Sequence, residues 1–264
     1  MNLRVGYIPY LNMAPFHIGF GPECLRMGDE GHIDFLPMSP RALGLEAQKG
    51  AIDAGALSLA DLLRLPDFER LGRFGIAMKG PAQSVLLFSD KPLSQFEGFC
   101  AVTDETSTSF RLLQVLLEKR YERTPRYGRV ASSLLFDGSA QGLLLIGDEA
   151  LRARREGVKA LPHVTDLGQE WLDWQGTPFV FACWAVHRSL PEELKRFISG
   201  RLENSLKSIK NMKHDDLERI ASRHGMSAVE AEAYWSGFHF QLTQAHERSI
   251  ETFKKFAPDL CLSV

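Results

Sequence analysis

Four side-chain hydroxyls stand in a row at residues 106–109, directly ahead of the periodic apolar pattern of Phe110–Tyr121. That pattern predicts a helix, and a helix N-terminus presents unpaired N–H groups with a partial positive charge. Hydroxyls beside such a terminus add donors, so Ser107, Thr108 and Ser109 suit a carboxylate or phosphate ligand. The alternative is an ordinary N-cap, which needs one hydroxyl.

Two further serines come where a predicted element begins. Ser58 follows an apolar run and opens a helix, and Ser58-x-x-Asp61 resembles a capping box with Asp in the place of Glu or Gln. Ser84 follows the turn at residues 80–83. A capping or turn role and a ligand contact are both open for each serine.

Asn12 and Asp148 also lie between a predicted strand and a predicted helix. Asn12 suits an Asx-turn or cap, or a ligand contact, because its amide both donates and accepts hydrogen bonds. Asp148 is expected to cap its helix, with a ligand contact as the alternative reading.

The sequence contains none of the common metal, phosphate or nucleophile signatures. No histidine pairs with another His or Cys at ligand spacing, and G-x-S-x-G, Walker A and G-x-G-x-x-G are all absent. We therefore predict no metal site and no dinucleotide site.

Short apolar runs alternate with helical patterns along most of the chain, which favours parallel, doubly wound α/β sheets. After residue 191 the pattern becomes almost wholly helical. We expect two α/β lobes with the chain crossing twice: residues 1–90 plus 182–264 in one, residues 91–181 in the other, and a ligand cleft between them. The predicted strands are at residues 3–8, 33–36, 52–57, 72–78, 84–88, 99–103, 133–136, 142–146 and 179–186.

Composition narrows the class of protein. The chain has 264 residues, 44% hydrophobic and 24% charged, with a net charge of −2. No basic excess, basic amphipathic stretch or long apolar run is present, so we expect neither a nucleic-acid nor a membrane partner. The N-terminus lacks the features of a signal peptide, which predicts a cytoplasmic protein. The cysteines are far apart and are expected to be free thiols: Cys24, Cys100, Cys183 and Cys261.

Six segments occur in this order along the chain: VGYIPYLNMAP at 5–15, SVLLFS at 84–89, TSTS at 106–109, LLIGDEAL at 144–151, DLGQEW at 166–171 and TPFVFACWAV at 177–186. Together they resemble the chorismate dehydratases of the futalosine route to menaquinone. The departures from that family include Leu59, where a second small hydroxyl residue is common, and Ala82 and Gln83 in the turn before Ser84.

The resemblance implies a two-lobed fold like the type II periplasmic binding proteins. It also implies an enzyme that converts chorismate to 3-[(1-carboxyvinyl)oxy]benzoate plus water, with chorismate as small-molecule partner and no cofactor. Asn12 would then be the catalytic residue. The substrate-binding residues would be Ser58, Ser84, Ser107, Thr108, Ser109 and Asp148.

Two other functions stay open at this point. One is the sister enzyme that makes 1,4-dihydroxy-6-naphthoate, and the other is a cytosolic carboxylate-binding sensor on the same fold. The catalytic base is also open. The matched segments contain no histidine, so one hypothesis makes the substrate's own enolpyruvyl carboxylate the base. No pattern in the sequence specifies an oligomeric state.

Overall fold

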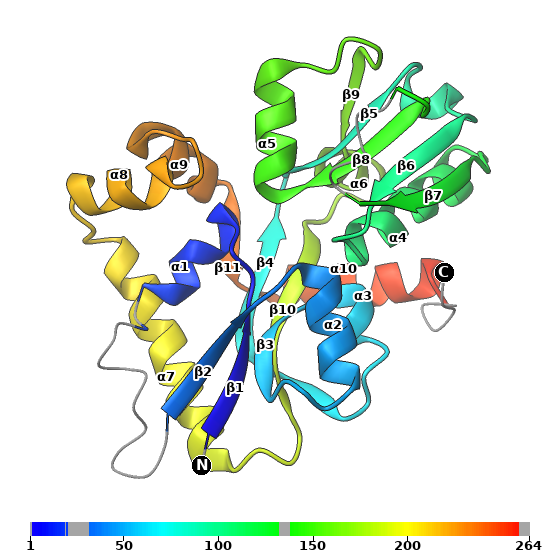
Figure 1. Cartoon of the computed structure of the whole chain (residues 1–264). Helices are drawn as coiled ribbons and strands as arrows, with labels where there is room; N and C mark the ends of the chain where they lie inside the picture. Colours follow the sequence, from blue (N-terminus) through cyan, green and yellow to red (C-terminus); the bar gives the residue numbers. More distant parts are fainter. Residues whose placement is uncertain (1, 19, 21–31, 132–137, 259–264) are drawn as a thin grey trace. The chain divides into compact units, whose positions relative to one another are not determined.

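The computed structural model describes residues 2–18, 20, 32–131 and 138–258, and its strands form two mixed sheets (Figure 1). The six-stranded sheet has the order β11-β4-β10-β3-β1-β2, and the five-stranded sheet has the order β7-β6-β8-β5-β9. Helices connect the strands, so the α/β prediction is confirmed.

In the six-stranded sheet, β1 (Asn2–Tyr7) pairs in parallel with β2 (His32–Pro37) and with β3 (Ala54–Ser58). Strand β10 (Phe179–His187) pairs antiparallel with β3, so the sheet is mixed rather than wholly parallel. The remaining strands are β4 (Phe68–Met78) and β11 (Phe238–Gln241).

In the five-stranded sheet, β6 (Phe99–Thr103) pairs in parallel with β7 (Arg126–Val130) and β8 (Gly142–Ile146). Strand β5 (Val85–Ser89) runs antiparallel to β8 and to β9 (His163–Asp166). Strands β5 and β8 are buried throughout, as their continuous apolar sequences predict for strands covered on both faces.

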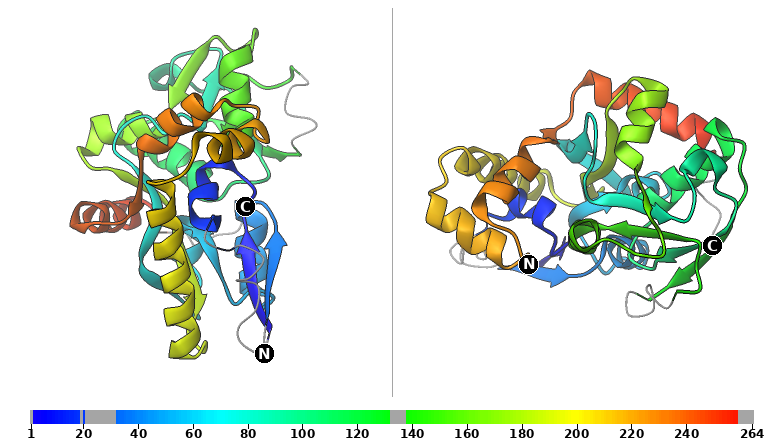
Figure 2. Two further views of the ribbon diagram at one scale, coloured as in Figure 1. Left: turned by 90° about the vertical axis from the view of Figure 1, so that its left-hand side faces the viewer. Right: turned by 90° about the horizontal axis from the view of Figure 1, so that it is seen from above.

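The helices follow the strands as the alternating pattern predicts. Helix α7 packs beside α1, as both views of Figure 2 show, and α8 packs against α9. The helices are η1 (Leu11–Met13), α1 (Ala14–His17), α2 (Pro40–Gln48), α3 (Leu59–Leu62), η4 (Leu93–Gln95), α4 (Thr108–Val115), the π-helix η5 (Leu116–Arg120), α5 (Gly147–Glu156), α6 (Leu167–Gln175), α7 (Glu192–Ile209), α8 (His214–Ser222), α9 (Ala228–Ser236) and α10 (Gln244–Phe256).

The chain divides into two compact units, Met1–Ile76 with Ala182–Leu242 and Ala77–Phe181 with Thr243–Val264. Residues 77–90 and 243–264, which we expected in the first lobe, belong to the second unit. Strand β5 belongs there because its hydrogen-bonded neighbours are β8 and β9. The chain therefore passes between the units three times rather than twice.

Helix α10 belongs to the second unit because it carries aromatic side chains that pack on α6. The Phe253 ring lies 6.0 Å from the Trp171 ring, and Phe256 stacks on Trp174 with 4.7 Å between ring centroids. Trp171 is fully buried. These contacts explain why a helix late in the sequence joins the unit formed by the middle of the chain.

Helix α2 begins with a capping serine followed by a proline. The Ser39 hydroxyl accepts a hydrogen bond from the Ala42 N–H at 3.3 Å, and Pro40 occupies the first helical position. Leu43 on this helix is fully buried against β1, where a Cβ built on Gly6 would lie 1.7 Å from the leucine Cδ1. The close approach of α2 to β1 therefore requires glycine at position 6.

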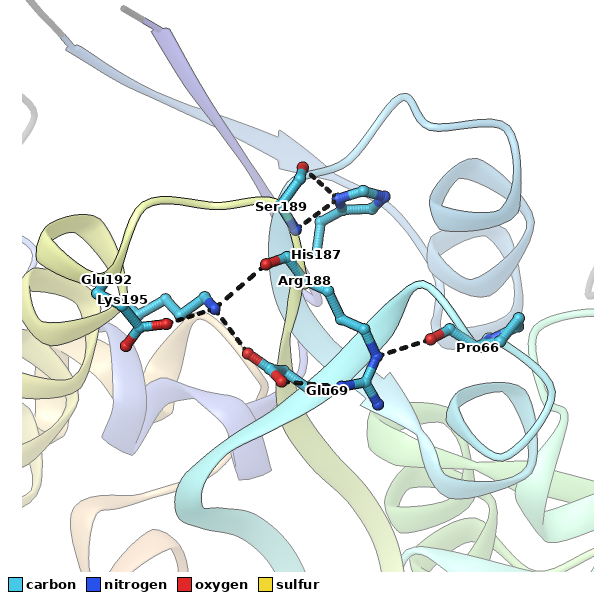
Figure 3. Close-up of polar contacts among 7 residues, drawn as sticks. All are labelled: Pro66, Glu69, His187, Arg188, Ser189, Glu192 and Lys195. Atoms are coloured by element: carbon cyan, nitrogen blue, oxygen red, sulfur yellow. Dashed lines mark hydrogen bonds and ion pairs between the residues drawn. The ribbon is translucent and has the colours of Figure 1, made fainter.

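An ionic cluster fixes the start of α7 to β4 and to the end of β10 (Figure 3). Lys195 Nζ lies 2.7 Å from Glu69 and 2.7 Å from Glu192, while Arg188 Nη1 lies 3.0 Å from Glu69. Arg188 also donates to the Pro66 carbonyl at 2.8 Å. The two carboxylates and two cations balance, so we interpret this cluster as structural.

The cysteines that the structure describes are free thiols, as predicted. Cys100 and Cys183 are both fully buried. Burial raises the pKa of the Cys100 thiol to about 12, so it is a packing group rather than a nucleophile. Cys24 and Cys261 lie outside the described residues, and so does the predicted strand at 133–136. In the part of the chain that the structure describes, no helix is long and apolar enough to cross a membrane.

Candidate active site

One edge of the five-stranded sheet gathers most of the predicted ligand-binding residues. Parallel β6 and β8 end at this edge, and antiparallel β5 begins there with Val85 opposite Ile146. The register therefore brings Ser84, the hydroxyl run 106–109 and Asp148 to a common edge. Helices α4, α5 and α6 all start here, so their N-terminal N–H groups supply positive potential.

The hydroxyl run is buried, and a serine of the run occupies the N-cap position of helix α4. Helix α4 begins at Thr108, two residues earlier than the apolar pattern predicts, and Ser107 is its N-cap. The Ser107 hydroxyl nevertheless makes no capping hydrogen bond. Ser107, Thr108 and Ser109 are each 7% exposed or less. This arrangement favours the anion-binding interpretation over the ordinary cap.

Arg129 places a positive charge beside the same segment. Its Nη1 donates to the Thr106 carbonyl at 2.8 Å, and its Cζ lies 5.0 Å from the Phe110 ring centroid. The hydrogen bond fixes the loop that leads into α4, and the guanidinium adds to the field of the helix terminus. No sequence pattern singles out Arg129, because its contact depends on the pairing of β7 with β6.

Ser84 lies in a tight turn at the start of β5 and is 1% exposed. Its hydroxyl donates to the Ala82 carbonyl at 3.3 Å. Its own carbonyl accepts a hydrogen bond from the Gly147 N–H at 2.9 Å, which ties the turn to the start of α5. The serine is therefore held from both sides by backbone hydrogen bonds.

Asp148 does not cap α5, contrary to expectation. The helix starts at Gly147, its N-cap is Ile146, and Asp148 lies in the first turn. The difference arises because Gly147 adopts a φ of 60° and turns the chain directly into the helix. The neighbouring Glu149 is half-buried. Burial is the main cause that raises the pKa of its carboxyl, and repulsion from the Glu105 carboxylate adds to it. Arg152, whose Nη2 lies 3.7 Å from the Glu149 carboxylate, acts against this rise.

Asn12 lies beyond the end of β1, at the equivalent edge of the six-stranded sheet. It occupies the middle of η1 between the buried residues Leu11 and Met13. The Trp235 Nε1–H donates to the Leu11 carbonyl at 2.9 Å and holds η1 against α9. The Asn12 Oδ1 is buried and has no hydrogen-bond partner among the described residues. A buried amide oxygen without a partner is available to accept a hydrogen bond from a ligand.

Ser58 lies at the same edge, because β3 ends there beside β1. Its hydroxyl accepts a hydrogen bond from the Asp61 N–H at 3.3 Å and donates to Asp61 Oδ2 at 2.7 Å. The predicted capping interaction is therefore present, and it occupies this hydroxyl in both directions. A substrate contact by Ser58 stays a prediction.

Two groups in the first unit were not predicted from the sequence. His17 Nε2 and Trp184 Nε1 are buried and have no hydrogen-bond partner among the described residues. Burial lowers the pKa of His17 to about 3, so its imidazole is neutral at physiological pH. The ring centroids of His17 and Trp184 lie 6.0 Å apart. A lone histidine and a strand tryptophan carry no signal in sequence that would single them out.

Within the described ranges, no three His, Cys, Asp or Glu side chains form a group that could hold a metal ion. What the two sheet edges offer instead is a set of neutral hydroxyl and amide groups together with helix N-termini. Such groups bind and orient a carboxylate ligand and stabilise negative charge that develops on it.

The architecture matches proteins of the periplasmic-binding-protein fold, as predicted. The Candida albicans CA3427 gene product, described as having the generic periplasmic binding protein structural fold, aligns with a TM-score of 0.69 at 10% identity, covering 100% of this chain and 92% of that chain. Protein AF1704 from Archaeoglobus fulgidus aligns with a TM-score of 0.79 at 15% identity and covers 97% of both chains. These two likenesses concern the fold alone.

The chain belongs to the menaquinone biosynthesis family, whose model matches residues 3–259. A curated relative, the chorismate dehydratase of Thermus thermophilus, is 28% identical over 273 aligned positions and covers 96% of each chain. The predicted resemblance is therefore confirmed. The comparisons do not favour the naphthoate-forming sister enzyme or a carboxylate sensor.

Proposed function

We propose that this protein is a chorismate dehydratase, a hydro-lyase that converts chorismate to 3-[(1-carboxyvinyl)oxy]benzoate and water. The proposal is supported by membership of the menaquinone biosynthesis family and by similarity to the Thermus enzyme over nearly the whole of both chains. The observation that carries it in this structure is the buried hydroxyl run at the start of α4, whose N-cap serine makes no capping bond.

Chorismate has a ring carboxylate and an enolpyruvyl carboxylate, and a near-neutral protein must bind both. Ser107, Thr108 and Ser109 bind one of them, with the N–H groups of α4 and the Arg129 charge behind them. Ser84 contributes to binding the other carboxylate, with Ser58 as a further candidate. Apart from Arg129, the groups proposed to bind the two carboxylates are neutral hydroxyl and backbone N–H donors, so oriented dipoles supply most of the binding energy.

The reaction begins at the ring C–H beside the ether oxygen. Loss of this proton leaves the bonding electron pair delocalised through a ring double bond onto the ring carboxylate, as an extended enolate. Donors at that carboxylate stabilise the charge as it develops. The electron pair then returns to the ring and expels the hydroxyl group, and the ring becomes aromatic.

Asn12 orients the substrate or the departing hydroxyl. Its unsatisfied Oδ1 accepts a hydrogen bond from the hydroxyl O–H, and its amide N–H₂ can donate. The enolpyruvyl carboxylate of the substrate takes the ring proton and passes it to the leaving hydroxide, which departs as water. The sum is the loss of one water, and no external oxidant, reductant or cofactor enters the balance.

The direct test is turnover of chorismate by the purified protein and by single variants. Wild type is expected to form the aromatic product, while Asn12→Ala and Ser84→Ala are expected to lose most of the kcat/KM. Ser107→Ala should chiefly raise KM, because it removes one of several donors to a carboxylate. The matched control is Ser208→Ala, which changes an exposed serine of α7 and should leave turnover unchanged.

Other outcomes have definite meanings. Turnover of a cyclic futalosine derivative instead of chorismate would assign the sister activity. Tight chorismate binding without any product would assign a sensor. Near-normal turnover by Asn12→Ala would remove Asn12 from the mechanism while leaving the activity in place. Cell fractionation tests the predicted cytoplasmic location.

A further inference from the structure

The side chain of Asp166, at the end of β9, collects hydrogen bonds from two different segments. Its Oδ1 accepts from the Ala82 N–H at 2.8 Å, and its Oδ2 accepts from the Gln83 N–H at 2.7 Å. The same Oδ1 accepts from Gly168 at 3.0 Å and Gln169 at 3.2 Å, which caps α6. One carboxylate therefore joins the start of α6 to the loop that precedes Ser84.

That loop contains a strained turn. Gln83 has a φ of 61°, in the left-handed region that only glycine adopts without cost. The Ser84 N–H donates to the Ala82 carbonyl at 2.7 Å, so residues 82–84 form a three-residue turn with the non-glycine Gln83 at its centre. A backbone of this kind persists only where its surroundings hold it.

Asp166 is the group that holds this turn, because it binds the backbone N–H of the two residues directly before Ser84. The fit around it is close. A Cβ on Gly168 would lie 2.8 Å from the Gly80 carbonyl oxygen and 3.1 Å from the Ala82 nitrogen. The start of α6 therefore packs against the loop without room for any side chain at position 168.

We propose that Asp166 is a positioning residue for the reaction, which sets the place of the Ser84 hydroxyl by holding the Ala82–Ser84 turn. The inference rests on the proposed function of Ser84 in binding the substrate. The inference gives Asp166 no direct contact with substrate, because its carboxylate already accepts four backbone N–H hydrogen bonds, three at Oδ1 and one at Oδ2. It acts through the backbone of the turn.

The variant Asp166→Asn separates the two roles of the carboxylate, which are to cap α6 and to hold the Ala82–Ser84 turn. Asparagine is as good an N-cap as aspartate, so its one carbonyl oxygen can keep the bonds to Ala82, Gly168 and Gln169. Its NH₂ then faces the Gln83 N–H, and two donors oppose each other. We expect kcat/KM to fall by about 10- to 100-fold, as displacement of a reacting contact by a fraction of an ångström to one ångström does.

The distinguishing readout is coupling to Ser84. In a Ser84→Ala background, Asp166→Asn should cause less than a threefold further loss, because the hydroxyl that it positions is already gone. Adding Gln83→Gly to Asp166→Asn should recover part of the loss when Ser84 is present, since glycine adopts a φ of 61° readily. Asp173→Asn, on the exposed side of α6, is the matched control.

The outcomes separate this inference from the proposed function. If wild type turns over chorismate and Asp166→Asn is equally active, the positioning role is overturned and the dehydratase activity stands. The same holds if the losses caused by Asp166→Asn and Ser84→Ala multiply independently of each other. Absence of wild-type turnover would overturn the proposed function. Amide hydrogen exchange at residues 83 and 84, which needs no substrate, should then still be faster in Asp166→Asn than in Asp173→Asn, and equal rates would overturn the positioning role.

Discussion

Replacing Asn12 by leucine should make the protein more stable and inactive. The Asn12 Oδ1 is buried with no hydrogen-bond partner among the described residues, and a buried unsatisfied acceptor costs about 1–3 kcal/mol. Leucine has nearly the same shape without the polar atoms, so the variant avoids this cost. We therefore expect the free energy of unfolding to rise by about 1–3 kcal/mol. In a protein of this size each kcal/mol corresponds to about 2–4 °C in Tm.

The assay is thermal unfolding of both proteins in the same buffer without substrate, followed by chorismate turnover. The control is Asn211→Leu, which changes an exposed asparagine after α7 and should leave Tm and turnover nearly unchanged. A gain in Tm with loss of turnover would identify an amide kept in place for its ligand at the expense of stability. If Asn12→Leu unfolds at or below the wild-type temperature, the reasoning is refuted, because the oxygen must then be satisfied in the folded protein.

Three further predictions test the surroundings of the two sheet edges. The pKa of His17 lies near 3 in the folded protein, below its unfolded value of 6.5, so the folded state binds fewer protons than the unfolded state. The protein therefore loses stability as pH falls from about 6.5 to about 3, by up to about 1.4 kcal/mol per pH unit. His17→Phe should flatten this acid limb in urea unfolding at several pH values, and an unchanged pH slope would contradict the burial of a neutral imidazole. Gly6→Ala should destabilise the protein by about 1–3 kcal/mol because the new Cβ meets Leu43. Leu43→Ala should then cost clearly less stability in the Gly6→Ala background than in wild type. Strictly additive losses would mean that the two side chains do not meet. Ser58→Ala should destabilise the protein by about 1 kcal/mol because the hydrogen bonds with Asp61 are lost, whereas Ser58→Thr should retain most of the stability. Equal denaturant midpoints for Ser58→Ala and wild type would argue against the cap.

The strands that the sequence predicts to within one residue include β5, β6 and β8, which are buried at nearly every position. β5, β6 and β8 are apolar at nearly every position, and β6 and β8 have the predicted bounds. The strands β7, β9 and β11 were not predicted, because they are short, largely exposed or half-buried, and rich in polar residues. Their partners in the sheet decide their structure, and sheet pairing is not a local property of the sequence. Contacts between residues far apart in the sequence also decide the unit to which β5 and α10 belong. Sheet pairing decides it for β5, and aromatic packing on α6 decides it for α10.

The candidate site was predictable only as far as local signals extend. The hydroxyl run and the Ser58 cap are encoded within a few residues, and both lie at helix starts in the structure. The position of Asp148 was not predicted because the cap was assigned by residue type alone, whereas Gly147 sets where α5 begins. Asp166 lies 84 positions after Ala82 and 83 positions after Gln83 in the sequence, so no local sequence pattern predicts these contacts.

The most direct measurement of the central claim follows chorismate deuterated at the ring carbon beside the ether, together with unlabelled chorismate, by liquid chromatography and mass spectrometry. The proposed reaction predicts a single aromatic product that has lost one water, with the deuterium gone from the ring and slower turnover of the labelled substrate. Unchanged chorismate, or a product that keeps the deuterium, would contradict a dehydration that begins by removal of this ring proton.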